Sequence, residues 1–225
     1  MTELIWKLET YWNLDYKTYL EKMKFYKEES KKNNNFATLL ICSHPHCFTN
    51  GRGLQRQSNG KISPELVTLS IEMENNLTYP LHQISRAGGL TFHYPGQVIV
   101  YPIVHIGKLS TSLLKFMYYL LKTAEKTIAE YSQELQFEIP KDNFGLWVKN
   151  KKIASIGMAL DRDITEHGMA INLNSDFSMF AALSKIFPCG LSGNSYTCLQ
   201  ELIHHEINLE DFKEKFKSNL SYNFL

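Results

Sequence analysis

The segment from Phe144 to Leu160 constrains the fold most strongly, because it has the pattern of a β-hairpin. Two apolar stretches, 144–148 and 153–160, flank the polar pair Asn150-Lys151, as expected for a turn between paired strands. Further strands are expected at 37–42, 97–104 and 168–173, the first ended by His44-Pro45 because proline removes a hydrogen-bond donor. The fold must therefore contain a sheet.

Other segments have helical spacing. Apolar residues at 16, 20, 23 and 26 predict a helix from Tyr16 to about Glu29. Ser110 is expected to cap a helix that reaches about Tyr131, with an apolar stripe at 113, 117, 120, 124 and 128. Asn208 is expected to cap a closing helix, and a short helix is expected near 177–183. Hairpins beside a few helices, with no linker-like stretch, predict one α+β domain over residues 1–225 with a mixed sheet.

The composition is that of a folded domain, and its charge is nearly balanced. Of the 225 residues 44% are hydrophobic, and the net charge of +1 gives no reason to expect binding to nucleic acid or to a membrane surface. Residues 1–7 do not have the pattern of a secretory signal, and no run approaches the ~20 apolar residues that span a bilayer. The four cysteines contain no Cys-x-x-Cys pair, so we expect reduced thiols and a cytoplasmic protein.

Cys189 is the clearest candidate for chemistry. It lies between Pro188 and Gly190, which favour a turn over a core strand, so its sulfur is expected to face a cleft. A lysine that approaches it would stabilise the nucleophilic thiolate, and Lys152 lies 37 residues earlier in the chain. A buried structural role is the ordinary interpretation of a single cysteine, and we retain it for Cys42, Cys47 and Cys198.

Residues 86–93 of the glycine-rich stretch 86–97 would, on their own, be interpreted as a structural loop before a strand. The stretch contains neither a dinucleotide-binding fingerprint nor a phosphate-binding loop. Its glycines would let backbone approach a ligand closely.

Taken together and in this order, the segments 86–97, 152–157, 167–172 and 188–199 resemble the octanoyltransferase family of lipoate biosynthesis. The resemblance extends over about residues 5–202. It implies a lipoyl/biotinyl-transferase-like catalytic fold: α+β, with a mixed, largely antiparallel sheet flanked by helices, as in class II aminoacyl-tRNA synthetases. It also implies ping-pong acyl transfer from octanoyl-acyl carrier protein to Cys189, and then to a lysine of a lipoyl domain. The acceptors would be 2-oxoacid dehydrogenase E2 subunits and the glycine cleavage H protein, with no cofactor, ATP or metal, no nucleic acid and no membrane.

The resemblance also implies the roles of individual residues. Cys189 would carry the acyl group as a thioester, and Lys152 would stabilise the thiolate and handle protons in both half-reactions. Lys152 is preferred to Lys151 because it directly precedes Ile153 and leaves Gly157 at the family's spacing, and alternation should place the two lysines on opposite faces. The expected walls of an apolar acyl pocket are Arg86, Ala87, Gly88, Gly89, Leu90, Thr91, Phe92, His93, Ser155, Ile156, Gly157, Gly168, Met169 and Ala170.

The sequence departs from the family's pattern inside the glycine-rich stretch. Ala87 replaces a glycine, Gly89 stands where an acidic residue is frequent, and Phe92 replaces a tyrosine. The largest departure is Tyr94, which stands where glycine is usual. Because Pro95 favours an extended backbone at Tyr94, we expect the ring to point away from Gly88-Gly89 and to lie over the mouth of the pocket.

The sequence leaves three alternative interpretations. A metal cluster is suggested by His44, His46 and Cys47, with His204-His205, but no second ligand pair has zinc spacing. His167 is interpreted as a residue that shapes the site. An ATP-dependent lipoate- or biotin-protein ligase of the same fold is the main competing activity, and Gly51-Arg52-Gly53 resembles a biotin ligase loop weakly. A non-catalytic protein that binds lipoyl domains is the third possibility.

Overall fold

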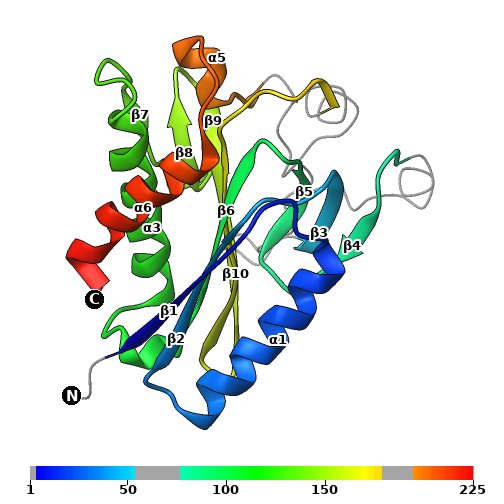
Figure 1. The fold of residues 1–225 in the computed structure, drawn as a ribbon, viewed down its shortest axis with the longest axis vertical. Coiled ribbons are helices and arrows are strands. Elements are labelled where there is room, and N and C mark those ends of the chain that lie inside the picture. Colours follow the sequence, from blue (N-terminus) through cyan, green and yellow to red (C-terminus); the bar gives the residue numbers. More distant parts are fainter. Residues whose placement is uncertain (1–3, 54–76, 179–194, 225) are drawn as a thin grey trace.

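Seven strands form one mixed sheet in the computed structural model, which describes residues 4–53, 77–178 and 195–224 (Figure 1). In spatial order they are β1 (Ile5–Tyr11), β2 (Phe36–Cys42), β6 (Gln97–Ile103), β10 (Ile164–Asn172), β9 (Lys151–Asp161), β8 (Gly145–Val148) and β7 (Phe137–Glu138). Strands β1 and β2 pair in parallel, whereas the other neighbours in this sheet pair antiparallel. The mixed, largely antiparallel sheet is therefore confirmed.

A second sheet carries the glycine-rich stretch. It has three strands in the order β4 (Leu81–Gln83), β3 (Cys47–Gly53) and β5 (Gly88–His93). The interpretation of 86–93 as a loop is wrong for most of its length, because residues 88–93 form β5, which pairs antiparallel with β3 from Cys47 to Gly53. A partner strand distant in the sequence overrides the weak strand preference of glycine.

The helices are α1 (Tyr16–Lys32), the 3-10 helix η1 (Ile106–Lys108), α3 (Leu113–Ala129), α5 (Leu199–Ile203) and α6 (Leu209–Phe224). Helices α1, α3 and α6 begin near their predicted starts, whereas η1 and α5 were not predicted. Asn208 caps α6 as predicted, since its Oδ1 accepts from the backbone N–H groups of Glu210 and Asp211 at 2.9 and 3.1 Å. The cap of α3 is Ser112 and not the predicted Ser110; the Ser112 hydroxyl oxygen accepts from Lys115 N.

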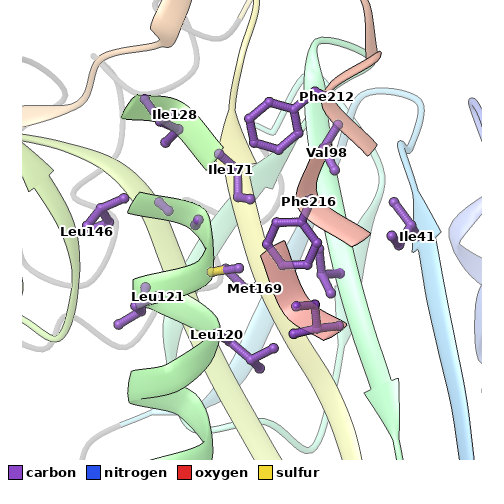
Figure 2. Close-up of a cluster of buried hydrophobic side chains, with 14 of the residues drawn as sticks. Ile41, Val98, Leu120, Leu121, Ile128, Leu146, Met169, Ile171, Phe212 and Phe216 are labelled. Carbon is purple, nitrogen blue, oxygen red and sulfur yellow. The ribbon is translucent and has the colours of Figure 1, made fainter. Parts of the chain in front are cut away.

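The helices cover opposite faces of the large sheet. On β6, Val98 and Val100 belong to the cluster under α3 and α6, whereas Ile99 and Tyr101 belong to the cluster under α1, as strand alternation requires. Figure 2 shows Phe212 and Phe216 of α6 and Leu120 of α3 packed over the strands. Each large apolar side chain buried in this way contributes about 1.5–3 kcal/mol to folding. Within the described residues no helix is both long and apolar enough to cross a membrane.

The predicted hairpin is present as β8 and β9, with its turn one residue earlier than expected. Lys149 and Asn150 have φ of 48° and 60°, the two left-handed residues of a tight hairpin turn. The register shifts further along, because Leu146 pairs with Ala154 whereas Trp147 pairs with Lys152. One extra residue is thereby inserted in β9, which makes a β-bulge at Ile153.

Candidate functional site

The bulge at Ile153 determines on which face of the large sheet the Lys152 side chain lies. Ile153 and Ala154 are consecutive, yet both are buried in the cluster under α3 and α6. Their neighbours on either side, Lys152 and Ser155, consequently lie on the opposite face of the sheet. Lys152 is only 6% exposed, whereas Lys151 is exposed, which agrees with the predicted alternation.

The aliphatic part of Lys152 passes directly over Gly145. A Cβ atom at Gly145 would stand 2.3 Å from Lys152 Cε and 3.2 Å from its Nζ, and φ at this glycine is 154°. The ring of Trp147, which is on β8 with Gly145, lies 5.5 Å from Lys152 Nζ. Glycine is thus required at 145 both for its conformation and for the space that Lys152 fills.

The backbone of Lys152 is tied to the chain that follows residue 194. Thr197 N donates to Lys152 O at 3.1 Å, and Tyr196 forms a parallel bridge with Lys152. The Asn172 side chain also donates to Thr197 O at 3.0 Å. The predicted nucleophile Cys189 lies outside the described residues, as do residues 54–76. Of the predicted helix near 177–183, only residues 177 and 178 are described, and both are helical.

The segments 155–157 and 168–170 form one surface, because Ser155, Ile156 and Gly157 pair with Ala170, Met169 and Gly168 in turn. Their side chains alternate, however. Met169 is fully buried in the cluster of Figure 2, and Ile156 packs against the same cluster. These two predicted wall residues can therefore line a pocket on the α1 face with their backbone only.

The glycine-rich stretch comes directly against this surface. A Cβ atom at Gly157 would stand 2.9 Å from Ala87 O and 3.4 Å from Arg86 Cδ. Only glycine at 157 permits so close an approach of the two segments. Leu90 and Phe92 of the same predicted wall face elsewhere, in a cluster with Phe48.

Arg86 is a second buried cation of this region in addition to Lys152, with 8% of its surface exposed. Its guanidinium donates to Thr49 O and Thr49 Oγ1, both at 3.0 Å, and to Thr91 Oγ1 at 2.6 Å. The sequence predicted Arg86 and Thr91 but missed Thr49, which no spacing or motif distinguishes from other strand threonines. Several neutral oxygens thus hold the guanidinium in place.

A chain of hydrogen bonds connects this cation to the strand beside Lys152. The Thr49 hydroxyl lies 3.2 Å from His93 Nε2, and His93 Nδ1 lies 3.0 Å from Gln97 Oε1. Gln97 then donates to Asn172 Oδ1 at 3.0 Å. Burial, and next the charges of neighbouring groups, lower the pKa of His93 well below its usual 6.5, so the ring is neutral.

Histidines that suggested a metal cluster have other partners. His44 Nδ1 donates to Leu14 O at 2.6 Å, and its Nε2 lies 3.0 Å from the Tyr101 hydroxyl. His46 Nε2 lies 3.0 Å from Asp176 Oδ2. Among residues 4–53, 77–178 and 195–224, no three His, Cys, Asp or Glu side chains are grouped closely enough to hold a metal ion.

Tyr94 is fully buried, so the expectation that its ring lies over the mouth of a pocket is wrong. The ring is 0% exposed and packs in the cluster of Phe48, Leu90 and Phe92. Its hydroxyl is a buried polar atom without a hydrogen-bond partner among the described residues. The large side chain is accommodated beside Gly96, where a Cβ atom would stand 2.7 Å from the ring.

Comparison with known families identifies the class of domain to which this arrangement belongs. The lipoyl protein ligase A/B catalytic domain matches residues 13–221. Since the match covers nearly all of the 225 residues, the chain belongs to the lipoyl protein ligase A/B catalytic domain family.

Curated relatives carry a more specific name. An octanoyltransferase from Thermoanaerobacter sp. (strain X514) is 32% identical over 194 residues, which cover 86% of this chain and 79% of the relative. The octanoyltransferase of Christiangramia forsetii is 32% identical over 182 residues, 78% of this chain and 72% of its own. That of Caldicellulosiruptor bescii is 31% identical over 181 residues, 80% and 75% of the two chains.

Solved structures with the same fold are more distant in sequence. A lipoate-protein ligase A bound with ATP superimposes with a TM-score of 0.67 at 10% identity, over 99% of this chain and 85% of that chain. A structure of protein Ta0514, a putative lipoate protein ligase from T. acidophilum, superimposes with a TM-score of 0.63 at 11% identity, over 99% of this chain and 85% of that chain. At such identities the likeness concerns the fold alone, and it confirms the α+β fold expected from the sequence.

Proposed function

We propose that this chain transfers an octanoyl group from a carrier-protein thioester to a lysine of a lipoyl domain, through a thioester at Cys189. The observation that carries the proposal is the burial of Lys152 on the sheet face that receives the glycine-rich stretch, in a chain whose curated relatives are octanoyltransferases. A buried ammonium or amine beside an acyl-binding surface is suited to proton transfer.

The reaction balances in two exchanges at one carbonyl carbon. The Cys189 thiolate attacks the carrier thioester, the new carbon–sulfur bond forms, and the carrier thiolate leaves and takes a proton. The acceptor lysine amine then attacks the Cys189 thioester, loses a proton and leaves as an amide, which restores the thiolate. Lys152 gives the proton in the first half and accepts one in the second, so neither ATP nor a metal enters the reaction.

The other cysteines support Cys189 as the nucleophile. Cys42 and Cys198 are 0% exposed and Cys47 is 4% exposed. Burial raises the pKa of Cys47 to about 12 and that of Cys198 to about 11, and it raises the pKa of Cys42 well above its usual value. Thiols held in this way form little of the reactive thiolate near neutral pH.

The donor in this proposal is octanoyl-acyl carrier protein, and the acceptors are lipoyl domains of 2-oxoacid dehydrogenase E2 subunits and of the glycine cleavage H protein. The chain acts as one catalytic domain in the cytoplasm. Free thiols at Cys42, Cys47 and Cys198 are compatible with that reducing compartment.

The test separates this transfer from ATP-dependent ligation. The protein is incubated with octanoyl carrier protein, or with octanoate and ATP, and its intact mass is measured before an apo lipoyl domain is added. We expect a hydroxylamine-sensitive octanoyl adduct from the carrier protein only, its loss in Cys189→Ala and its retention in Cys198→Ala. An adduct that maps to Cys198, or modification of the lipoyl domain only with octanoate and ATP, would refute the proposal.

A further inference from the structure

A buried polar cluster links helix α1 to the start of the glycine-rich stretch. Lys27 of α1 forms an ion pair with Glu166 of β10, and its Nζ lies 2.7 Å from Asp161 Oδ2. The Ser85 hydroxyl lies 2.8 Å from Glu166 Oε2 and 3.0 Å from His167 Nε2. Lys27, Glu166 and His167 are all buried. Burial of ionisable groups is costly unless they are paired and hydrogen-bonded. Each hydrogen bond in this cluster therefore needs one donor and one acceptor.

The proton positions follow from the partners. A serine hydroxyl carries one proton, and a carboxylate is a stronger acceptor than a neutral imidazole. Ser85 therefore donates to Glu166 and offers only lone pairs to His167, so His167 Nε2 carries the imidazole proton. His167 Nδ1 is then a bare acceptor, and it is one of the buried atoms without a partner among the described residues. Burial, and next the charge of Arg86, lower the pKa of His167 to about 4, which keeps the ring neutral.

The same serine holds the backbone that lies against Gly157. Its carbonyl oxygen accepts from Arg52 Nε at 2.5 Å, while its hydroxyl is held by Glu166. Ser85 directly precedes Arg86 and Ala87, whose atoms leave no room for a Cβ at Gly157. His167 has a left-handed φ of 62°, which a residue other than glycine keeps only where its surroundings impose it.

We propose that Glu166 is a positioning residue: acting through Ser85, it selects the Nε2–H tautomer of His167 and holds the Arg86-Ala87 backbone against Gly157. The kinetic consequence rests on the proposed function, in which this backbone lines the site of the octanoyl donor. Asp161 provides a matched comparison, because it pairs with the same Lys27 ammonium.

The test compares Glu166→Gln with Asp161→Asn, each of which removes one negative charge beside Lys27. In Glu166→Gln the amide NH₂ group can donate to Ser85, which frees the hydroxyl to donate to His167 Nε2. Nitrogen-15 NMR of the imidazole should show the Nε2–H tautomer in the wild type and in Asp161→Asn, and a mixture in Glu166→Gln. The KM for octanoyl carrier protein should rise about tenfold in Glu166→Gln, the effect of losing one charge-assisted hydrogen bond, with a much smaller change in kcat.

Substitutions of Ser85 test the same link without changing a charge. Ser85→Ala should reproduce the increase in KM, and Ser85→Thr, which keeps the hydroxyl, should restore a KM near that of the wild type. A wild-type His167 protonated at Nδ1, an equal increase in KM in Asp161→Asn, or no increase in Ser85→Ala would each overturn the proposal. The NMR measurement needs no transfer activity, so an inactive wild type would refute the proposed function and leave the tautomer assignment testable.

Discussion

At the scale of single residues, Lys151 and Lys152 differ in burial although they are neighbours in sequence. Lys152 is 6% exposed above Gly145, whereas Lys151 is exposed. Lys152→Ala should slow both half-reactions by about a hundredfold or more, the usual contribution of a positioned proton-transfer group. Lys151→Ala should leave both rates nearly unchanged. Single-turnover rates of Cys189 acylation and of transfer to the lipoyl domain measure this, and equal losses in the two variants would show that the register is misassigned.

Buried neutral histidines make stability depend on pH. Burial lowers the pKa of His44 to about 4, while an unfolded chain has a histidine pKa of ~6.5. Between these values the unfolded state binds a proton that the folded state does not, so stability falls as pH decreases from about 6.5 to 4, by up to about 3 kcal/mol for this group. Urea denaturation across this range should give a shallower pH dependence for His44→Gln than for the wild type. His205→Gln, which changes an exposed side chain, should keep the wild-type slope.

At the scale of elements, the start of α3 offers two serines for comparison. Ser112 caps the helix through its bond with Lys115 N, whereas Ser110 lies outside the helix with φ of 50°. Ser112→Ala should lower the free energy of unfolding by about 1 kcal/mol, the usual value of an N-cap. Ser110→Ala should change it by clearly less. Urea denaturation of both variants measures this, and the reverse order would restore Ser110 as the cap.

Local sequence patterns predicted most of the long helices and strands, but not the contacts that orient the site residues. The periodicity of α1, the cap at Asn208 and the hairpin of β8 and β9 are properties of neighbouring residues, and the structure confirms them. The bulge at Ile153 depends on the pairing of Leu146 with Ala154, which alternation alone does not specify. Strand β1 was missed because Ile5–Tyr11 is a half-exposed edge strand with a weak apolar pattern. Thr49 was missed because its partner Arg86 comes 37 residues later.

At the scale of the whole molecule, the large sheet separates the main core from the candidate site. Phe216 of α6 is fully buried on one face (Figure 2). Lys152, Gly157 and Arg86 lie on the other face. A change confined to the core face should therefore alter stability more than substrate binding.

Phe216→Ala tests this separation. Removal of a fully buried phenyl ring should lower the free energy of unfolding by about 3–5 kcal/mol, because it loses apolar burial and leaves a cavity. At a temperature where the variant remains folded, its KM for octanoyl carrier protein should match that of the wild type, since the sheet lies between the cavity and the glycine-rich stretch. Phe25→Ala is the matched control, because Phe25 is 58% exposed on α1 and should cost little stability. An increase in KM for folded Phe216→Ala would show that core packing on the α6 face also sets the geometry of the opposite face.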